Sequence, residues 1–290
     1  CDKENLNPLF LYYYLSSDKI VEKLDSIAEG STSAYPSIRP SDIENLDINL
    51  PPLPEQKAIA SVLNSLDDKI DLLHRQNQTL EAMSETIFKQ WFIIEPKQNW
   101  KIQRLDELLT VRRGGSPRPI QNYLSSNGFR WLKISDVTHL NSPYIFDINE
   151  RIIEEGLKKT VFLEKGSLVL SNSATPGIPK ILMVDSCIHD GWLYFPESNF
   201  PTEFLYLLFK AIRLQLVAQG NGSIFTNLKT DILKNYEISV PPEKELQIFQ
   251  RKVNPLFDKM LINTKQIYTL QNLRDILLPK LISGKVRVQS

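Results

Sequence analysis

Two segments with the same helical pattern, 190 residues apart, constrain the fold of this chain more than any other feature. In the first, the steps between core-type positions alternate between four and three: Leu66, Ile70, Leu73, Asn77, Leu80, Ser84, Ile87 and Trp91. This spacing is typical of the seam of a two-stranded coiled coil. Pro54 and Glu55 suit the first turn of a helix. A helix over 55–91 would be roughly 55 Å long, so we expect a spacer.

The second copy aligns without a gap when the sequence is shifted by 190 positions. Pro51 and Pro52 then match Pro241 and Pro242. Its seam, which again includes one Asn, consists of Leu256, Met260, Asn263, Ile267, Leu270 and Leu277. Two long helices with imperfect seams in one chain most simply pack on each other. One seam does not distinguish parallel from antiparallel pairing, but we expect a pseudo-two-fold repeat to pair antiparallel.

The segments around the two helices predict an α+β fold, in which a mixed α/β domain is flanked by the helix pair. We expect helices at 8–28, 105–109 and 202–218, and strands at 46–50, 129–134, 160–163, 167–170, 180–184 and 236–240. The predicted division is 1–50, 51–95, 97–240 and 241–290. Because nothing equivalent to residues 97–200 precedes the first helix, we expect 1–50 to be the end of a first domain whose greater part is missing.

The net charge of zero conceals an uneven distribution. Residues 1–96 carry sixteen acidic and eight basic side chains, which gives −8, so the remaining residues carry +8. A local basic excess at 97–118 favours contact with a polyanion, although a solvated charged face explains it equally well. Two cysteines are too few for a disulfide framework or a zinc site, and we expect a cytoplasmic protein without a membrane span.

Sequence motifs for catalysis are absent. The chain has no GxxxxGK[ST] phosphate loop, no GxGxxG after a strand, no GxSxG and no HExxH. His74, His139 and His189 are far apart in the sequence, and the pair His189–Asp190 has no third member that would make it a nucleophilic site. We therefore predict neither catalytic residues nor a metal site.

Two loops have the composition of recognition loops. Residues 112–119 read Arg-Arg-Gly-Gly-Ser-Pro-Arg-Pro, in which glycines allow close backbone approach and arginines can bind phosphates or guanine edges. Residues 171–177 place short polar side chains after a predicted strand, where recognition side chains often lie. An ordinary mobile loop and an ordinary turn are the alternatives.

Taken together, these features resemble the specificity subunit of type I restriction–modification enzymes. The resemblance covers essentially the whole chain and rests on residues 50–60, 66–70, 76–83, 88–92, 115–117, 131–136 and 278–284. The second helix departs from the pattern, with Pro-Glu-Lys-Glu at 242–245 where the first has Pro-Leu-Pro-Glu-Gln. The predicted helix is unaffected by this difference.

The resemblance implies a DNA-binding subunit that performs no chemistry. Residues 97–240 would be a target recognition domain that reads one half of a bipartite site, and the helices would dock the methyltransferase subunits, expected to number two. S-adenosylmethionine, ATP and Mg would belong to the methyltransferase and the restriction/translocase subunits. We predict contacts to duplex DNA, without sorting bases from phosphates, from Arg112, Arg113, Ser116, Arg118, Lys133, Asn172, Ser173, Thr175, Asn221, Ser223, Asn227 and Lys229.

A different class of function is the alternative. The acidic side chains of the first helix would also suit a coiled-coil adaptor whose α/β domain binds protein and reads no DNA sequence. Salt-dependent binding of residues 97–240 to duplex DNA distinguishes the two hypotheses.

Overall fold

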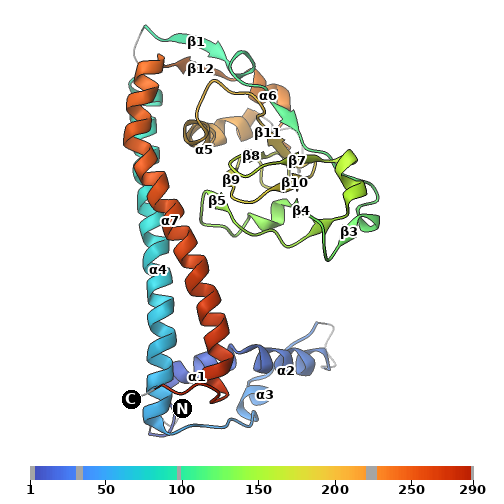
Figure 1. Cartoon of the computed structure of the whole chain (residues 1–290), viewed down its shortest axis with the longest axis vertical. Coiled ribbons are helices and arrows are strands. Elements are labelled where there is room, and N and C mark those ends of the chain that lie inside the picture. The colour runs from blue at the N-terminus through green and yellow to red at the C-terminus, as the bar shows by residue number, and fades with distance from the viewer. Residues whose placement is uncertain (1–3, 31–34, 97–98, 220–226, 289–290) are drawn as a thin grey trace. The chain divides into compact units, whose positions relative to one another are not determined.

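The computed structural model describes residues 4–30, 35–96, 99–219 and 227–288 (Figure 1). The chain divides into two compact units, Cys1–Arg75 with Lys265–Ser290, and Gln76–Thr264. Two long helices, α4 (Leu53–Lys89) and α7 (Glu243–Ile282), contribute to both units. The α+β fold class predicted from the sequence is confirmed. The boundaries between the compact units fall inside α4 and α7, whereas the predicted domain boundaries lie at the ends of the long helices.

Both long helices extend slightly beyond their predicted starts. Helix α4 has 37 residues and continues into a π-helical turn, Gln90–Ile94, while α7 has 40 residues. Their pairing is antiparallel within each unit. In the first unit Asp67 pairs with Arg274, and Glu55 with Arg287. In the second unit the partners of Asn77 and Phe88 are Asn263 and Phe249, so the partner number falls as the α4 number rises.

The buried stripe of each helix differs in part from the predicted seam. Ile70, Leu73, Asn77, Met260, Asn263 and Ile267 are buried as the seam requires. Leu66, Leu80, Ile87, Leu256, Leu270 and Leu277 are half-buried. Next to two of these positions, Phe88 and Phe257 are the buried residues. At these two positions the buried residue is therefore one position after the predicted seam residue. The larger aromatic side chains are buried there because the helices also pack on other elements.

The described part of the first unit contains three short helices beside its parts of α4 and α7: α1 (Pro8–Leu15), α2 (Asp18–Glu29) and α3 (Pro40–Glu44). The single helix predicted at 8–28 is wrong, because Ser17 is extended (φ −73°, ψ 140°) and ends α1. The Ser17 hydroxyl donates to the carbonyl of Tyr14 at 2.6 Å, which satisfies a group freed by the break. The predicted strand at 46–50 is also wrong, since those residues form no strand.

In its described residues, the second unit carries three sheets. The first pairs β1 (Lys101–Arg104) with β12 (Glu237–Val240). The second has the order β3 (Leu124–Ser125), β6 (Arg151–Ile152), β4 (Phe129–Leu132), β10 (Ser186–Ile188) and β7 (Val161–Leu163). The third has the order β2 (Arg112–Arg113), β11 (Trp192–Tyr194), β8 (Leu168–Ser171), β9 (Pro179–Leu182) and β5 (Tyr144–Ile145). Most pairs are antiparallel, but β4–β10 and β5–β9 are parallel.

Two predicted elements of this unit end earlier than expected. The helix predicted at 105–109 is a 3-10 turn, Leu105–Glu107. The strand predicted at 129–134 ends at Leu132, and a 3-10 turn, Ile134–Asp136, follows. The Asp136 carboxylate accepts from the Lys133 backbone N–H at 2.8 Å, which closes that turn. The segments predicted at 202–218 and 236–240 are α5 (Thr202–Gln219) and β12.

An aromatic core fixes the sheets in the second unit. Helix α5 packs on β8 and β9, and Figure 1 shows it beside those strands. Phe88, Phe204 and Phe249 are all 0–1% exposed, and their rings pack edge to face at centroid distances of 5.1 to 6.0 Å. On the other side of β8, Trp192 is fully buried. The strand ends, and the loops that leave them, are thereby held on a rigid base.

Candidate nucleic-acid interface

The arginine loop, residues 112–118, begins on β2 and folds against the turn between β10 and β11. Arg113 is opposite Leu193 in the β2–β11 register. The Gly114 N–H donates to the Trp192 carbonyl at 2.9 Å. A Cβ at Gly114 would lie 2.3 Å from the His189 carbonyl oxygen, so only glycine allows this approach. The glycines that follow the two arginines therefore serve backbone packing.

Asp190, in the turn between β10 and β11, is the centre of the loop's hydrogen bonds. Ser116 Oγ donates to Asp190 Oδ1 at 2.7 Å, and the Asp190 N–H donates to Ser116 Oγ at 3.2 Å. Arg118 Nη2 contacts Asp190 Oδ2 at 3.2 Å, and Arg113 Nε donates to the Asp190 backbone carbonyl. Burial alone would raise the pKa of Asp190. The Ser116 hydrogen bond and the charges of Arg113, His189 and Arg118 outweigh it and lower that pKa.

Asn172, at the end of β8, joins three segments from inside the protein. Its side chain is 3% exposed. With the amide oriented to suit both partners, its nitrogen donates to the Leu228 carbonyl at 2.5 Å and its oxygen accepts from Arg113 Nε at 3.2 Å. The Asn172 N–H also donates to the Gly191 carbonyl at 2.7 Å, and the Leu228 N–H to the Asn172 carbonyl at 2.8 Å. Asn227 and Lys229, which flank Leu228, are exposed.

The loop after β8 turns sharply toward the same turn. Ala174 has a φ of 58°, and the Thr175 N–H donates to the Ser173 carbonyl at 2.6 Å. Ser173 and Thr175 are half-buried. Ser173 Oγ would lie 2.6 Å from a Cβ at Gly191, so its hydroxyl is close to the Asp190 turn.

The remaining predicted residues are placed differently. Arg112 is exposed on β2, opposite Tyr194. Lys133 pairs with Glu150 at 2.5 Å, and its side chain is 37% exposed. Asn221 and Ser223 lie outside the described residues. The structure thus brings together Arg113, Ser116, Arg118, Asn172 and Ser173, with Asn227 and Lys229 beside Leu228.

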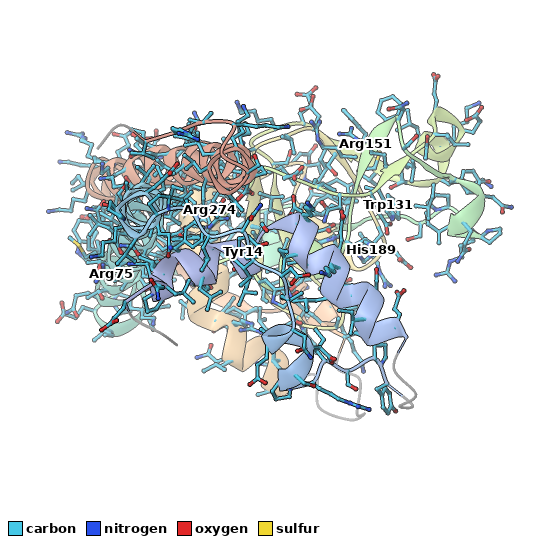
Figure 2. All side chains as sticks on the ribbon, turned by 90° about the horizontal axis from the view of Figure 1, so that it is seen from below. Tyr14, Arg75, Trp131, Arg151, His189 and Arg274 are labelled. Carbon is cyan, nitrogen blue, oxygen red and sulfur yellow. The ribbon has the colours of Figure 1, made fainter. Side chains whose placement is uncertain are left out.

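Sequence reasoning did not identify the part of His189 and Asp190 in this site. His189 lies near Trp131, with ring centroids 6.0 Å apart, and Figure 2 shows these two side chains beside each other. Its Nδ1 accepts from the Gly191 N–H at 2.7 Å, and burial lowers the pKa of His189 despite Asp190. The dipeptide Asp190–Gly191 is a turn signal, but only the fold shows that the arginine loop packs on this turn.

The described ranges lack the features of a metal site and of a membrane span. No group of three or more His, Cys, Asp or Glu side chains that could hold a metal occurs in them. None of the helices there is long and apolar enough to cross a bilayer. Cys187 is buried, which raises its pKa to about 11 and leaves it a poor nucleophile.

Comparison with known proteins agrees with the fold. The sequence profile described as Type I restriction modification DNA specificity domain matches residues 2–82 and 97–272. The MjaIX specificity subunit of a type I restriction enzyme from Methanocaldococcus jannaschii is 28% identical over 99% of this chain and 71% of its own length. The HindI specificity subunit of Haemophilus influenzae is 23% identical over 96% and 77% of the two chains.

A solved structure shows the same fold. The S subunit of the type I restriction-modification system of M. genitalium has a TM-score of 0.59 and 20% identity, and the match covers 97% of this chain and 74% of that one. The profile match extends over most of the sequence and includes both the arginine loop and most of the two long helices. The chain therefore belongs to the family of type I restriction–modification DNA specificity subunits.

Proposed function

We propose that this chain reads one half of a bipartite DNA target for a type I restriction–modification complex. The observation that carries the proposal is the convergence of polar and basic side chains from three segments on one site. We call this site the recognition face and define it as Arg113, Ser116, Arg118, Ser173, Asn227 and Lys229. Loops on a rigid sheet are a common place for recognition residues.

The chemistry of the recognition face suits duplex DNA. Arginine presents a planar fork of N–H donors, which binds phosphate oxygens and the O6 and N7 atoms of guanine. Arg118 has 80% of its side chain exposed. Arg113 uses Nε for its contacts with Asp190 and Asn172, so those contacts do not involve its two terminal nitrogens. Because Asn172 is buried, we assign it the positioning of Arg113 rather than a direct DNA contact.

The other parts of the chain support a role in assembly. We propose that residues 51–95 and 241–290 are spacers on which two methyltransferase subunits dock, and that 97–240 is the target recognition domain. Exposed apolar side chains on the long helices favour docking: Leu72, Met83, Ile262, Leu273 and Ile276. The chain itself would perform no catalysis, and S-adenosylmethionine, ATP and Mg would be bound by the methyltransferase and restriction/translocase subunits.

Binding to random-sequence duplexes over a range of salt concentrations tests the DNA assignment. Each phosphate contact contributes about −0.9 to the slope of log affinity against log salt. We expect the double variant Arg113→Ala, Arg118→Ala to bind more weakly. The slope should become less negative by about twice this amount, because two phosphate contacts are lost. Arg251→Ala, which removes an exposed arginine on α7, is the matched control and should change neither quantity.

Two results would contradict the proposal. If the double variant binds with an unchanged slope, the recognition face is not where DNA binds. If the intact chain shows no salt-dependent binding even at low ionic strength, the coiled-coil adaptor becomes the better hypothesis. The adaptor would still bind the methyltransferase subunit.

A further inference from the structure

We propose that Asp190 is a positioning residue that holds the arginine loop in the conformation competent to bind DNA. This proposal rests on the proposed function, and it assigns a role to a residue that carries the wrong charge to contact DNA itself. An acidic side chain among DNA-binding arginines repels phosphate. Its presence at the centre of the recognition face therefore needs a reason other than direct binding.

The hydrogen bonds supply that reason. Ser116 and Asp190 form a reciprocal pair, in which the Ser116 hydroxyl donates to the carboxylate at 2.7 Å and accepts from the Asp190 N–H at 3.2 Å. Such a pair fixes one side chain of the loop to both the backbone and the side chain of the turn. A loop ordered before binding loses less conformational entropy when DNA arrives.

The turn that carries Asp190 is itself rigid. It leaves β10 and enters β11, whose residues Ile188, Trp192 and Leu193 are fully buried. The Gly191 N–H donates to His189 Nδ1 at 2.7 Å, and the Gly191 carbonyl accepts from the Asn172 N–H at 2.7 Å. Asp190 is therefore a fixed anchor, and the loop is the element that it positions.

The two arginines are attached to this anchor by different groups. Arg118 pairs with the carboxylate at 3.2 Å, whereas Arg113 donates to the backbone carbonyl. Removing the Asp190 side chain should therefore remove the carboxylate contacts of Ser116 and Arg118. The backbone contacts of Asp190 with Ser116 and Arg113 would stay in place. Asn172 provides a second contact with Arg113, which further limits the disturbance to residues 114–118.

Two substitutions at Asp190 separate positioning from charge, because both remove the negative charge. Asp190→Asn keeps an oxygen that can accept from Ser116, while Asp190→Ala does not. On electrostatics alone, both variants would bind DNA more tightly. If Asp190 positions the loop, Asp190→Asn should bind a duplex selected by the wild-type chain at least as tightly as wild type, and Asp190→Ala should bind it about five- to tenfold more weakly.

Amide hydrogen exchange of the free, full-length chain gives a readout that needs no DNA. We expect exchange in residues 114–118 to be at least about fivefold faster in Asp190→Ala and in Ser116→Ala, and near the wild-type rate in Asp190→Asn. The double variant of Ser116 and Asp190 to Ala should exchange less than the product of the two single accelerations predicts, because both single variants lose the bond from the Ser116 hydroxyl to the Asp190 carboxylate. Asp258→Ala, at an exposed position of α7, is the control and should match wild type.

The outcomes distinguish this proposal from the proposed function. Unchanged exchange in both Asp190→Ala and Ser116→Ala overturns the positioning role, and so does tighter DNA binding by Asp190→Ala. If wild type binds no duplex, the proposed function fails. In that case accelerated exchange would show an anchored loop without a role in DNA binding, and this proposal fails as well. Should Asp190→Ala not fold, Ser116→Ala is judged by the same exchange and binding criteria.

Discussion

At the scale of single residues, Lys180 is the buried group with the clearest consequence for stability. It lies on β9 with 5% of its surface exposed, and its ammonium donates to the carbonyls of Leu140, at 2.8 Å, and Ser142. Burial lowers the pKa of Lys180 from 10.5 to about 8. The folded state therefore holds this proton less strongly than the unfolded state, and the charge costs stability below pH 8.

This difference predicts a dependence of stability on pH. Between pH 8 and 10.5 the unfolded chain binds more protons at Lys180 than the folded chain, so its contribution to the free energy of unfolding rises with pH. The separation of the two pKa values limits the gain to about 3 kcal/mol. Denaturant unfolding at pH 7 and pH 10 should show wild type gaining stability relative to Lys180→Met. Wild type should show no such gain relative to Lys165→Met, a substitution at an exposed position. If wild type gained as much stability relative to Lys165→Met as relative to Lys180→Met, the prediction would be wrong.

The recognition face shows what residue types in sequence order can and cannot predict. Ser116 and Arg118 were selected from the sequence because the loop that holds them combines glycines with basic and short polar side chains, and their contact with DNA stays a prediction. The position of Asp190 beside Ser116 was not predicted, because it depends on β10 and β11 bringing residue 190 beside residue 116. Nor does the sequence show that Asn172 is buried, since an amide at a strand end can point either way.

At the scale of elements, a polar layer interrupts the contact between α4 and α7 in the second unit. Asn263 Nδ2 donates to Asn77 Oδ1 at 3.0 Å, and Asn77 Nδ2 donates to Thr264 Oγ1 at 3.2 Å. Both asparagines are at most 2% exposed. Within the part of the chain that the structure describes, Asn263 Oδ1 is buried without a partner. A misaligned pairing of the helices would leave further amides unsatisfied, so this layer favours one register.

The layer predicts coupled effects on stability. Asn77→Ala or Asn263→Ala alone should lower the free energy of unfolding by about 1–3 kcal/mol, because each leaves the other amide buried without its partner. The double variant should lose less than the sum, with a coupling of about 1 kcal/mol in a double-mutant cycle measured by urea unfolding. The exposed pair Asn64 and Asp68 on α4, joined at 2.8 Å, is the control and should couple by less than about 0.5 kcal/mol. If the losses of unfolding free energy at Asn77 and Asn263 were additive, the polar layer would not have the proposed role in fixing the helix register.

The elements that the sequence predicted well are those with many repeats of one pattern. The long helices show the seam pattern over several heptads, so a one-position shift at Phe88 or Phe257 leaves the prediction of each helix intact. Strands such as β2 and β5 have two residues each, too few to show a periodicity. The break at Ser16–Ser17 depends on local side-chain hydrogen bonds, which compete with helix in any serine pair and are not decided by spacing.

At the scale of the whole molecule, net charge alone would hide the properties that matter for binding. The total is zero, but residues 1–96 carry −8 and the rest +8. Binding to DNA should therefore depend on the recognition face and not on overall attraction. The internal repeat and the family were readable in the sequence because both involve long stretches. The limits of the compact units, at Arg75 and Thr264, were not, since they depend on which contacts the folded chain makes.

Assembly with the methyltransferase provides a prediction for the molecule as a subunit, and it follows from the proposed docking on the long helices. In the first unit, Leu273 and Ile276 of α7 are 42% and 55% exposed, and at a spacing of three they are neighbours on one face of the helix. A carboxylate at such a face, once covered by an apolar partner surface, would lose its hydration without gaining a counter-ion. We expect Ile276→Glu to weaken binding to the methyltransferase subunit of its own system by at least about tenfold, which is about 1.4 kcal/mol. Isothermal titration calorimetry measures this loss, and an unchanged melting temperature of the variant chain excludes unfolding as its cause.

Ser26→Glu introduces the same charge at an exposed position of α2, so it should bind like wild type. If Ile276→Glu also binds like wild type, this face of α7 is not the docking surface. Binding of the Ile276→Glu chain to random duplexes should remain unchanged, because docking and DNA recognition would use different residues.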